Sequence, residues 1–281
     1  MDKLKYRLVC VDLDGTLLKD DKTITKENIE IIKKATSKGV VVCVATGRIL
    51  KFVDRVKDLL EIDTPVIASN GGVLFYKENK MKINPLSYNN ILKIKKIANN
   101  YNVEIYLNTE DSIISEKLMP DDYSYKKVNK EVLDKYKVNI IENYSFEKLY
   151  KEDNKQAVKA ICINKDNLEE VKRVRKALED TGEFEISSAE DHYCEINLKG
   201  ISKGKVVEDL AKELGINIEE VMCIGDGGND IEMLKKAGIA VAMENGIPEV
   251  KEIAHYITSS NNESGVGKAI RELIFNDYKD T

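Results

Sequence analysis

The chain has 281 residues, of which 42% are hydrophobic, and its 44 basic and 49 acidic side chains give a formal net charge of −5. This length suits two domains of ordinary size or one large one, and the apolar content is ample for packed cores. The acidic excess argues against nucleic-acid binding, and no apolar run approaches the roughly 20 residues that a membrane-spanning helix needs. We therefore expect a cytoplasmic protein whose partners include neither nucleic acid nor a membrane.

The first predicted strand ends in two carboxylates. Residues 6–11 form a largely apolar run that continues into Asp12-Leu13-Asp14-Gly15-Thr16. Asp12 and Asp14 would project to the same side of the strand end, because side chains alternate along a strand. Taken alone, such a segment is more typical of a turn. At the carboxyl end of a parallel strand, however, it lies where open α/β sheets bind their ligands.

Three further apolar runs end in polar loops that contain glycine. These runs and their loops cover residues 40–45 with 46–48, 65–68 with 69–71, and 221–224 with 225–230. Helical periodicity with a capping residue at the start and a glycine at the end predicts helices over residues 25–38 and 202–214. Apolar runs without alternation are typical of central parallel strands, which are joined by right-handed crossovers. The pattern therefore predicts a doubly wound, parallel α/β sheet.

The middle of the chain follows a different pattern, and we expect it to be an inserted domain. Alternating strands such as residues 184–186 and 193–196 indicate a sheet with one wet face, as in an α+β unit. We place the catalytic core at residues 1–83 and 197–281 and the inserted α+β cap at residues 84–196. A hinge near each boundary would let the cap open and close over the loops of the core.

Further elements are expected within this cap. Strands are predicted over residues 103–107 and 157–163, and helices over residues 91–99 and 166–179. The second helix would open with Asp166 in a capping box. Three tyrosines in a lysine-rich stretch are more typical of a mixed surface than of a binding site; they are Tyr123, Tyr125 and Tyr136.

The cysteine and histidine content restricts the kinds of metal site and catalytic site that the chain can form. None of the cysteines forms a Cys-x-x-Cys pair, so buried, reduced thiols are expected rather than disulfides or a zinc site. The chain has only two histidines, so a histidine-rich metal site or a serine hydrolase triad is not expected. The cysteines are Cys10, Cys43, Cys162, Cys194 and Cys223.

If the strand ends converge, several carboxylates share one crevice. Asp12, Asp14, Asp226 and Asp230 would then repel one another unless a cation compensates their charges. Mg²⁺ fits best, because it prefers carboxylate and carbonyl oxygens and commonly sits beside phosphate.

The neighbouring loops offer phosphate-binding groups. Thr46 supplies a hydroxyl, Gly47 lets backbone amides approach an anion, and Lys203 stands at the start of a predicted helix. Asp12, ionised near neutral pH, could attack phosphorus. Asp14 could protonate the departing alcohol and then deprotonate the hydrolytic water.

These motifs, in this order, resemble those of the haloacid dehalogenase superfamily. The resemblance is to its Cof-type phosphatases of subclass IIB, which carry an α/β cap of the C2 type. Residues 12–16 are similar to the first motif, Thr46 to the second, Lys203 to the third and residues 225–230 to the fourth. The match spans nearly the whole chain and implies a Rossmann-like core.

The resemblance implies roles for the acidic residues. Asp12 would carry an aspartyl-phosphate intermediate, and Asp14 would act as acid and base. Mg²⁺ would be held by Asp12, the carbonyl of Asp14 and Asp226, while Asp230 would support the metal through its waters. Asp14 also separates phosphatases from dehalogenases and P-type ATPases, whose corresponding residue is not an aspartate.

By the same resemblance, Thr46 and Lys203 would bind the phosphoryl group, with Asn229 within reach of both. Lys203 would also screen the nucleophile. A small departure is Gly246, where relatives usually carry alanine, and it touches no proposed catalytic group.

The expected activity is hydrolysis of small phosphate esters, and two alternatives stay open. A phosphosugar mutase would return the phosphoryl group to a sugar instead of water. A phosphorylation-controlled regulatory protein would also combine acidic residues, Thr and Lys, although in a different order and in a shorter chain.

The substrate is not specified by these motifs, because they hold the phosphoryl group and leave the rest of the molecule to the cap. Sugar phosphates, FMN and pyridoxal phosphate remain candidates. Residues that could contact the substrate are Arg48 near the phosphate and Asn108, Glu110 and His192 in the cap. The sequence gives no indication of the oligomeric state.

Overall fold

The larger sheet of the computed structural model has eight strands, in the order β14-β13-β12-β1-β2-β3-β4-β5. The structure describes residues 4–77, 80–153, 155–188 and 192–276. The strands from β14 to β3 pair in parallel, which confirms the predicted α/β core. The bounds are β1 Leu8–Val11, β2 Val41–Ala45, β3 Val66–Ala68, β4 Val73–Lys77, β5 Lys80–Ile83, β12 Val221–Gly225, β13 Ile239–Ala242 and β14 Tyr256–Ile257.

One edge of this sheet was not predicted. β4 and β5 form an antiparallel extension of β3. The chain reverses through the 3₁₀ turn Ser69–Gly71, where Gly71 has φ +100°. Glycine adopts this φ readily, whereas other residues rarely do. The tight turn therefore returns the chain directly as the next strand, without a crossover helix.

Helices cover both faces of the larger sheet. Val9 and Val11 pack in the cluster that contains residues of α1, α2 and α10, whereas Leu8 and Cys10 pack in the cluster that contains residues of α7, α8 and α9. This alternation follows from the period of two along a strand. The bounds are α1 Lys26–Ser37, α2 Leu50–Leu60, α7 Lys203–Glu213, α8 Ile231–Lys236, α9 Pro248–Ile253 and α10 Gly265–Ile270.

The two helices predicted in the core are present with their caps. The side chain of Thr25 accepts a hydrogen bond from the N–H of Asn28 at the start of α1. Ser202 does the same for the N–H of Lys205 in α7. Shorter turns of 3₁₀ helix occur at Ile218–Glu220, Gly228–Asp230 and Asn261–Glu263, and a π-helix at Arg271–Asn276.

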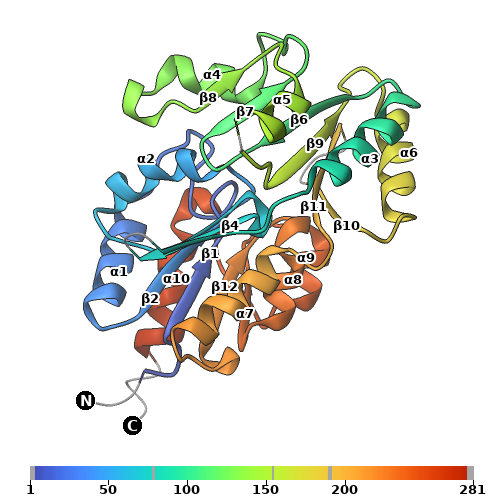
Figure 1. Cartoon of the computed structure of the whole chain (residues 1–281). Helices are drawn as coiled ribbons and strands as arrows, with labels where there is room; N and C mark the ends of the chain where they lie inside the picture. The colour runs from blue at the N-terminus through green and yellow to red at the C-terminus, as the bar shows by residue number, and fades with distance from the viewer. Residues whose placement is uncertain (1–3, 78–79, 154, 189–191, 277–281) are drawn as a thin grey trace.

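A second sheet is built from the central segment of the chain, in the order β10-β11-β9-β6-β7-β8. α3, α5 and α6 pack on one face of it, and the other face is directed toward the core (Figure 1). β11 runs past the expected boundary at residue 196, and the domain limits themselves stay a prediction. The bounds are β6 Glu104–Asn108, β7 Ser112–Ser115, β8 Asn139–Ile141, β9 Lys159–Ile163, β10 Phe184–Ser187, β11 Tyr193–Leu198, α3 Tyr88–Asn99, α4 Ser124–Glu131, α5 Phe146–Lys151 and α6 Leu168–Glu179, with a 3₁₀ turn at Asp134–Tyr136.

The predicted capping box at Asp166 is wrong. α6 begins one residue later than that cap would allow, and Asn167 caps it by accepting from the N–H of Glu170. The side chain of Asn164 accepts from the N–H groups of Asp166 and Asn167, both at 3.0 Å. This local turn holds Asp166 outside the helix, because an Asn side chain competes with the helix for backbone donors.

The expected tyrosine surface is also wrong for two of the three residues. Tyr123 and Tyr125 are buried, and the Tyr125 hydroxyl accepts from the N–H of Ile49 in the core at 3.2 Å. Tyr136 is half-buried, and its hydroxyl donates to Asp58 of α2. These contacts show that Tyr125 and Tyr136 join the central segment of the chain to the core.

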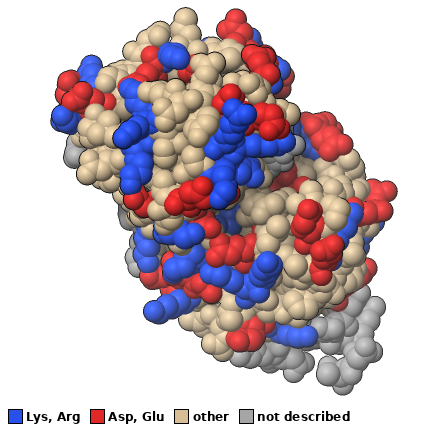
Figure 2. Space-filling view, turned by 90° about the vertical axis from the view of Figure 1, so that its right-hand side faces the viewer, with Lys and Arg blue, Asp and Glu red and all other residues tan. Residues whose placement is uncertain are grey.

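The structure also shows the state of the cysteines and the distribution of charged side chains. All five cysteines are buried and free of disulfides, as predicted. Figure 2 shows acidic and basic side chains interspersed over both lobes of the face that it presents. Among the described residues, no helix combines the length and the apolar character that crossing a bilayer requires.

Close packing between α7 and α8 leads to a first prediction. A Cβ on Gly204 would lie 2.7 Å from the carbonyl carbon of Glu232 and 2.8 Å from the backbone nitrogen of Met233. Gly204→Ala should therefore lower the free energy of unfolding by about 1–3 kcal/mol, because overpacking outweighs the better helix propensity of alanine. Urea denaturation measures this change. The exposed Lys212→Ala in the same helix is the control and should stay within about 0.5 kcal/mol; an unchanged Gly204→Ala would show that the helices can separate freely.

Candidate active site

Four polar loops meet at the carboxyl edge of the larger sheet. β12, β1, β2 and β3 are neighbours in that order, so the loops that follow them lie side by side. Asp12 and Asp14 come from the loop after β1, Thr46 from the loop after β2, and Asp226 and Asp230 from the loop after β12. The edge is where parallel α/β sheets generally bind ligands.

Asp12, Asp226 and Asp230 form a carboxylate cluster around one buried lysine. One oxygen from each carboxylate lies within 4.8 Å of the others. The ammonium group of Lys203 donates to Asp12 and to Asp230, both at 2.6 Å. The second oxygen of Asp230 accepts from the N–H groups of Asp226 and Gly227 at 3.0 Å. These bonds fix the cluster by joining three separate loops.

The cluster contains three carboxyl groups and one ammonium group. Burial raises the pKa of Asp12 well above its usual range, although Lys203 works against this shift. Burial also raises the pKa of Asp226 to about 6, despite a 2.6 Å hydrogen bond from the hydroxyl of Thr16. Burial alone would lower the pKa of Lys203, but Asp12 and Asp230 raise it. One lysine against three carboxylates leaves a set of oxygen donors that fits a hard divalent cation.

Asp14, expected to share the crevice with these carboxylates, is not among the three clustered aspartates and pairs with Arg48 instead. Its carboxylate accepts from Nε and Nη2 of Arg48 at 2.8 and 3.0 Å, and from Lys22 at 3.0 Å. Burial would raise the pKa of Asp14, but Arg48 and Lys22 hold it well below its usual range. The guanidinium of Arg48 also stacks against Phe52 of α2 and against Tyr125 of α4. Asp14 is thus ionised, the form that accepts a proton.

The loop after β2 has room for little more than a glycine at its centre. Thr46 is buried, and its hydroxyl oxygen accepts from the N–H of Arg48 at 3.0 Å. A Cβ on Gly47 would lie 3.0 Å from the amide oxygen of Asn70 and 3.5 Å from the amide nitrogen of Asn229. Asn229 in turn donates to Asn70 at 3.2 Å. The structure therefore brings Gly47 and Asn229 together, and their binding of a phosphoryl group stays a prediction.

Two charged residues of the second sheet reach this loop, and both were missed from the sequence. Lys159 donates to the carbonyl of Gly47 at 2.7 Å and forms a buried ion pair with Glu195. Glu195 accepts from Asn70 at 2.7 Å. The available signal was the presence of one charged side chain in each of two largely apolar strands, since such residues are seldom buried without a partner.

The sequence of the chain is similar to those of known proteins. The sequence profile of the haloacid dehalogenase-like hydrolases matches residues 9–270. The chain belongs to this family. The 5-amino-6-(5-phospho-D-ribitylamino)uracil phosphatase YcsE of Bacillus subtilis is 30% identical over 278 residues, which cover 97% of the hydrolase and 98% of that relative.

Solved structures agree with this assignment. A haloacid dehalogenase-like hydrolase from B. subtilis superposes with a TM-score of 0.84 at 27% identity, covering 95% of this chain and 99% of that one. A sugar phosphatase of subclass IIB superposes with a TM-score of 0.77 at 26% identity, covering 95% and 98%. The hydrolase is a Cof-type phosphatase that acts on small phosphorylated molecules, as expected. Enzymes of this family generally use a divalent metal, for which the carboxylate cluster is the candidate site.

The cap residues expected to contact the substrate have different positions in the hydrolase. Asn108 is fully buried and lies opposite Lys159 in the β6–β9 pair. Glu110 is half-buried, and its carbonyl accepts from the N–H of Lys51 at 3.2 Å. His192 precedes β11, whose first residue pairs with Ile163.

His192 is therefore not brought beside Gly47. Lys159, at one end of β9, contacts Gly47, whereas Ile163 is the other end of the same strand. At about 3.3 Å per residue, these ends are roughly 13 Å apart. The sequence did not reveal this strand register, and a contact of His192 with the substrate stays a prediction.

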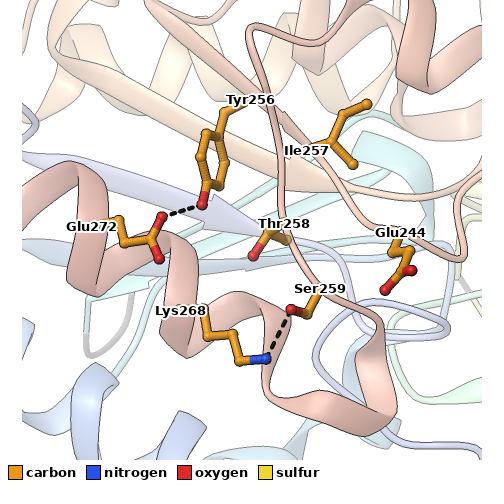
Figure 3. Close-up of a pocket in the computed structure, with 7 residues that line it drawn as sticks. All are labelled: Glu244, Tyr256, Ile257, Thr258, Ser259, Lys268 and Glu272. Atoms are coloured by element: carbon orange, nitrogen blue, oxygen red, sulfur yellow. Dashed lines mark hydrogen bonds between the residues drawn. The ribbon is translucent and has the colours of Figure 1, made fainter.

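A pocket of about 330 Å³ lies at the β14 edge of the hydrolase (Figure 3). Lys268 donates to Ser259 at 2.8 Å in this pocket, and Tyr256 bonds to Glu272. Its lining contains none of the carboxylates or loop residues described above, so it is separate from the candidate active site. The lining residues are Glu244, Tyr256, Ile257, Thr258, Ser259, Lys268 and Glu272.

Proposed function

We propose that the hydrolase is a Mg²⁺-dependent phosphatase that works through an aspartyl phosphate on Asp12. The observation that carries this proposal is the buried contact of Lys203 with both Asp12 and Asp230. Lys203 counteracts the rise that burial causes in the pKa of Asp12, and so favours the ionised form that can act as a nucleophile. Asp12, the carbonyl of Asp14 and Asp226 would hold Mg²⁺, with Asp230 behind them. When bound, Mg²⁺ would supply charge stabilisation for the phosphoryl oxygens.

The reaction would proceed in two displacements. In the first, a carboxylate oxygen of Asp12 attacks phosphorus, the ester P–O bond breaks, and the leaving oxygen takes a proton from Asp14. In the second, water attacks the phosphorus of the aspartyl phosphate and gives its proton to Asp14, which regenerates Asp12 and releases phosphate. Thr46, Gly47, Asn229 and Lys203 would bind the phosphoryl group throughout.

The Arg48 ion pair bears on the order of these proton transfers. In the structure, Arg48 favours the ionised form of Asp14, which suits the second displacement. The first displacement requires a proton on Asp14, so Arg48 would have to release this carboxylate. The phosphoryl group is the natural alternative partner, because guanidinium binds phosphate oxygens in a bidentate manner. This would also give Arg48 the role near the phosphate that the sequence analysis suggested.

The substrate class follows in part from the relatives. A relative with 30% identity acts on a phosphorylated ribityl compound by its name, and a structural neighbour is a sugar phosphatase. We propose sugar or alditol phosphates, with FMN and pyridoxal phosphate as further candidates. The free, buried cysteines agree with a reducing cytoplasmic location, and we propose no nucleic-acid partner.

The test is phosphate release from a panel of phosphorylated metabolites, with Mg²⁺ or with a chelator. The proposal expects release that depends on the metal and differs between esters. Transfer between sugar hydroxyl groups without accumulation of phosphate would favour the mutase. A long-lived phosphoenzyme with negligible turnover would favour a regulatory role, and absence of both release and transfer would contradict the proposed activity.

Binding of Mg²⁺ should depend on pH. The pKa of Asp226 is raised to about 6, and a protonated carboxylate is a poor metal ligand. The apparent affinity should therefore fall about tenfold between pH 7 and pH 5, with proton release on binding. Isothermal titration calorimetry in buffers of different ionisation enthalpy measures both effects. The control Asp226→Asn should bind weakly at both pH values; a wild-type affinity that does not change with pH would contradict this assignment of Asp226.

A further inference from the structure

Three polar side chains of the cap lie together on the face that is directed toward the core. Asn108 on β6 is opposite Lys159 on β9, and Glu195 on β11 forms an ion pair with Lys159. All three are buried, Asn108 completely. Because residues that pair across strands share a face of the sheet, these three belong to one group, which we name the cap triad.

The cap triad lies directly over the loop that would hold the phosphoryl group. Lys159 contacts the carbonyl of Gly47 at 2.7 Å. A carboxylate oxygen of Glu195 is 3.5 Å from the position that a Gly47 Cβ would occupy, and it also accepts from Asn70. If Gly47 contacts the phosphoryl group, the carbon atom that carries the ester oxygen must lie within a few bond lengths of this triad.

Asn108 adds an observation that points to a ligand. Within the part of the chain that the structure describes, neither the amide nitrogen nor the amide oxygen of its side chain has a hydrogen-bond partner. Buried polar groups are partnered in the large majority of cases, and leaving one without a partner costs about 1–3 kcal/mol. A group that bonds to both atoms of the Asn108 amide must accept one hydrogen bond and donate another. A hydroxyl group can do both.

The other two members of the cap triad extend this chemistry. Lys159 offers ammonium donors and Glu195 offers carboxylate acceptors, so the three side chains alternate between donors and acceptors. Adjacent hydroxyl groups on a carbon chain present the same alternation. An unsubstituted alkyl chain at this place would leave all three polar groups without new partners.

We propose that the cap triad recognises the hydroxyl groups of the leaving alcohol, so that the hydrolase is selective for phosphate esters of polyhydroxylated compounds. This proposal rests on the proposed phosphatase activity and adds to it the specificity-determining residues Asn108, Lys159 and Glu195. On substrate binding, hydroxyl groups would complete the amide of Asn108 and would share the ion pair of Lys159 with Glu195.

The test compares two esters that differ in hydroxyl groups, ribitol 5-phosphate and 1-pentyl phosphate, alongside a panel of hexose phosphates. For the best hydroxylated ester, wild-type kcat/KM should exceed that of pentyl phosphate by at least about 100-fold, since sites built to bind a hydroxyl reject analogues that lack it. Asn108→Leu, which keeps the size but not the amide, should lower kcat/KM for the hydroxylated ester at least about 10-fold. For pentyl phosphate the change should be less than about threefold.

Two further variants complete the design. Glu195→Gln keeps the size and removes the charge, and it should show the same selective loss. Asn139→Leu, an exposed asparagine at the edge of the same sheet, is the matched control and should change neither ester. Thermal unfolding of Asn108→Leu should be at or above the wild-type midpoint, because an unpartnered buried amide is removed.

The outcomes separate this inference from the proposed function. A wild-type enzyme that cleaves both esters equally, or an Asn108→Leu variant that loses activity equally toward both, would overturn the role of the cap triad while leaving the phosphatase intact. Failure of the wild-type enzyme to release phosphate from any ester would instead overturn the proposed activity and the inference with it.

Discussion

Asp12→Asn should abolish phosphate release from every ester that the hydrolase cleaves, with a fall in kcat of at least about 1,000-fold. An amide nitrogen or oxygen cannot replace the carboxylate oxygen that attacks phosphorus. We expect the variant to fold, because Lys203 keeps its 2.6 Å bond to Asp230. Phosphate release under saturating substrate and Mg²⁺ measures the loss.

Two controls make this result specific to Asp12. Asp134→Asn changes an exposed aspartate that pairs with Lys137, and it should keep full activity. Rapid-quench experiments with a ³²P-labelled ester should trap a labelled, acid-stable phosphoenzyme in the wild-type protein and none in Asp12→Asn. Residual activity above about one per cent, after contamination is excluded by purification, would assign the nucleophile to another group.

Lys203→Met should cause the largest loss of stability. The variant leaves Asp12, Asp226 and Asp230 close together without the buried ammonium that bonds to two of them. Removing one partner of a buried ion pair typically costs about 3–5 kcal/mol, and the free energy of unfolding at pH 7 should fall by that amount. Denaturation in guanidinium chloride measures the change, and kcat should fall as well because the phosphoryl group loses a cationic partner.

The pH dependence distinguishes this explanation from a simple packing defect. The pKa of Asp226 is raised to about 6 in the folded protein and is about 3.9 in an unfolded chain. Its ionised form therefore opposes folding above about pH 6, and this opposition disappears as pH falls toward 4. The difference between wild-type and Lys203→Met should shrink over this range, whereas a packing defect would persist.

The surface variant Lys236→Met sets the scale for this comparison. Lys236 forms partly exposed ion pairs with Glu208 and Glu232, and such pairs contribute about 0–1 kcal/mol. A loss for Lys203→Met that is no larger than this value would show that the carboxylates tolerate one another without the lysine.

The core could be predicted from the sequence because its signals are local. Each central strand is a short apolar run that ends in a polar loop, and Thr25 and Ser202 mark the helix starts. Parallel strands bring such loops to one edge, so the proximity of Asp12, Asp226 and Asp230 follows from pattern alone. The catalytic roles of these residues stay predictions.

The cap was less predictable because its features depend on register and on docking. Lys159 and Glu195 meet only when β9 and β11 pair antiparallel in one register, and they reach Gly47 only when the sheet lies against the core. The same register places His192 near Ile163, at the end of β9 opposite to Lys159. Likewise, the burial of Tyr125 results from a contact with Ile49 that is distant in sequence.

The free cysteines can be used as probes of local opening, because each of the two sheets contains its own set of buried thiols. Cys10, Cys43 and Cys223 lie in register on adjacent strands of the core, and Cys162 faces Cys194 across two strands of the cap. A buried thiol reacts with a labelling reagent only after the surrounding structure opens. Labelling kinetics followed by peptide mass spectrometry would thus resolve the opening of each sheet separately in a single unmodified chain, without an introduced probe.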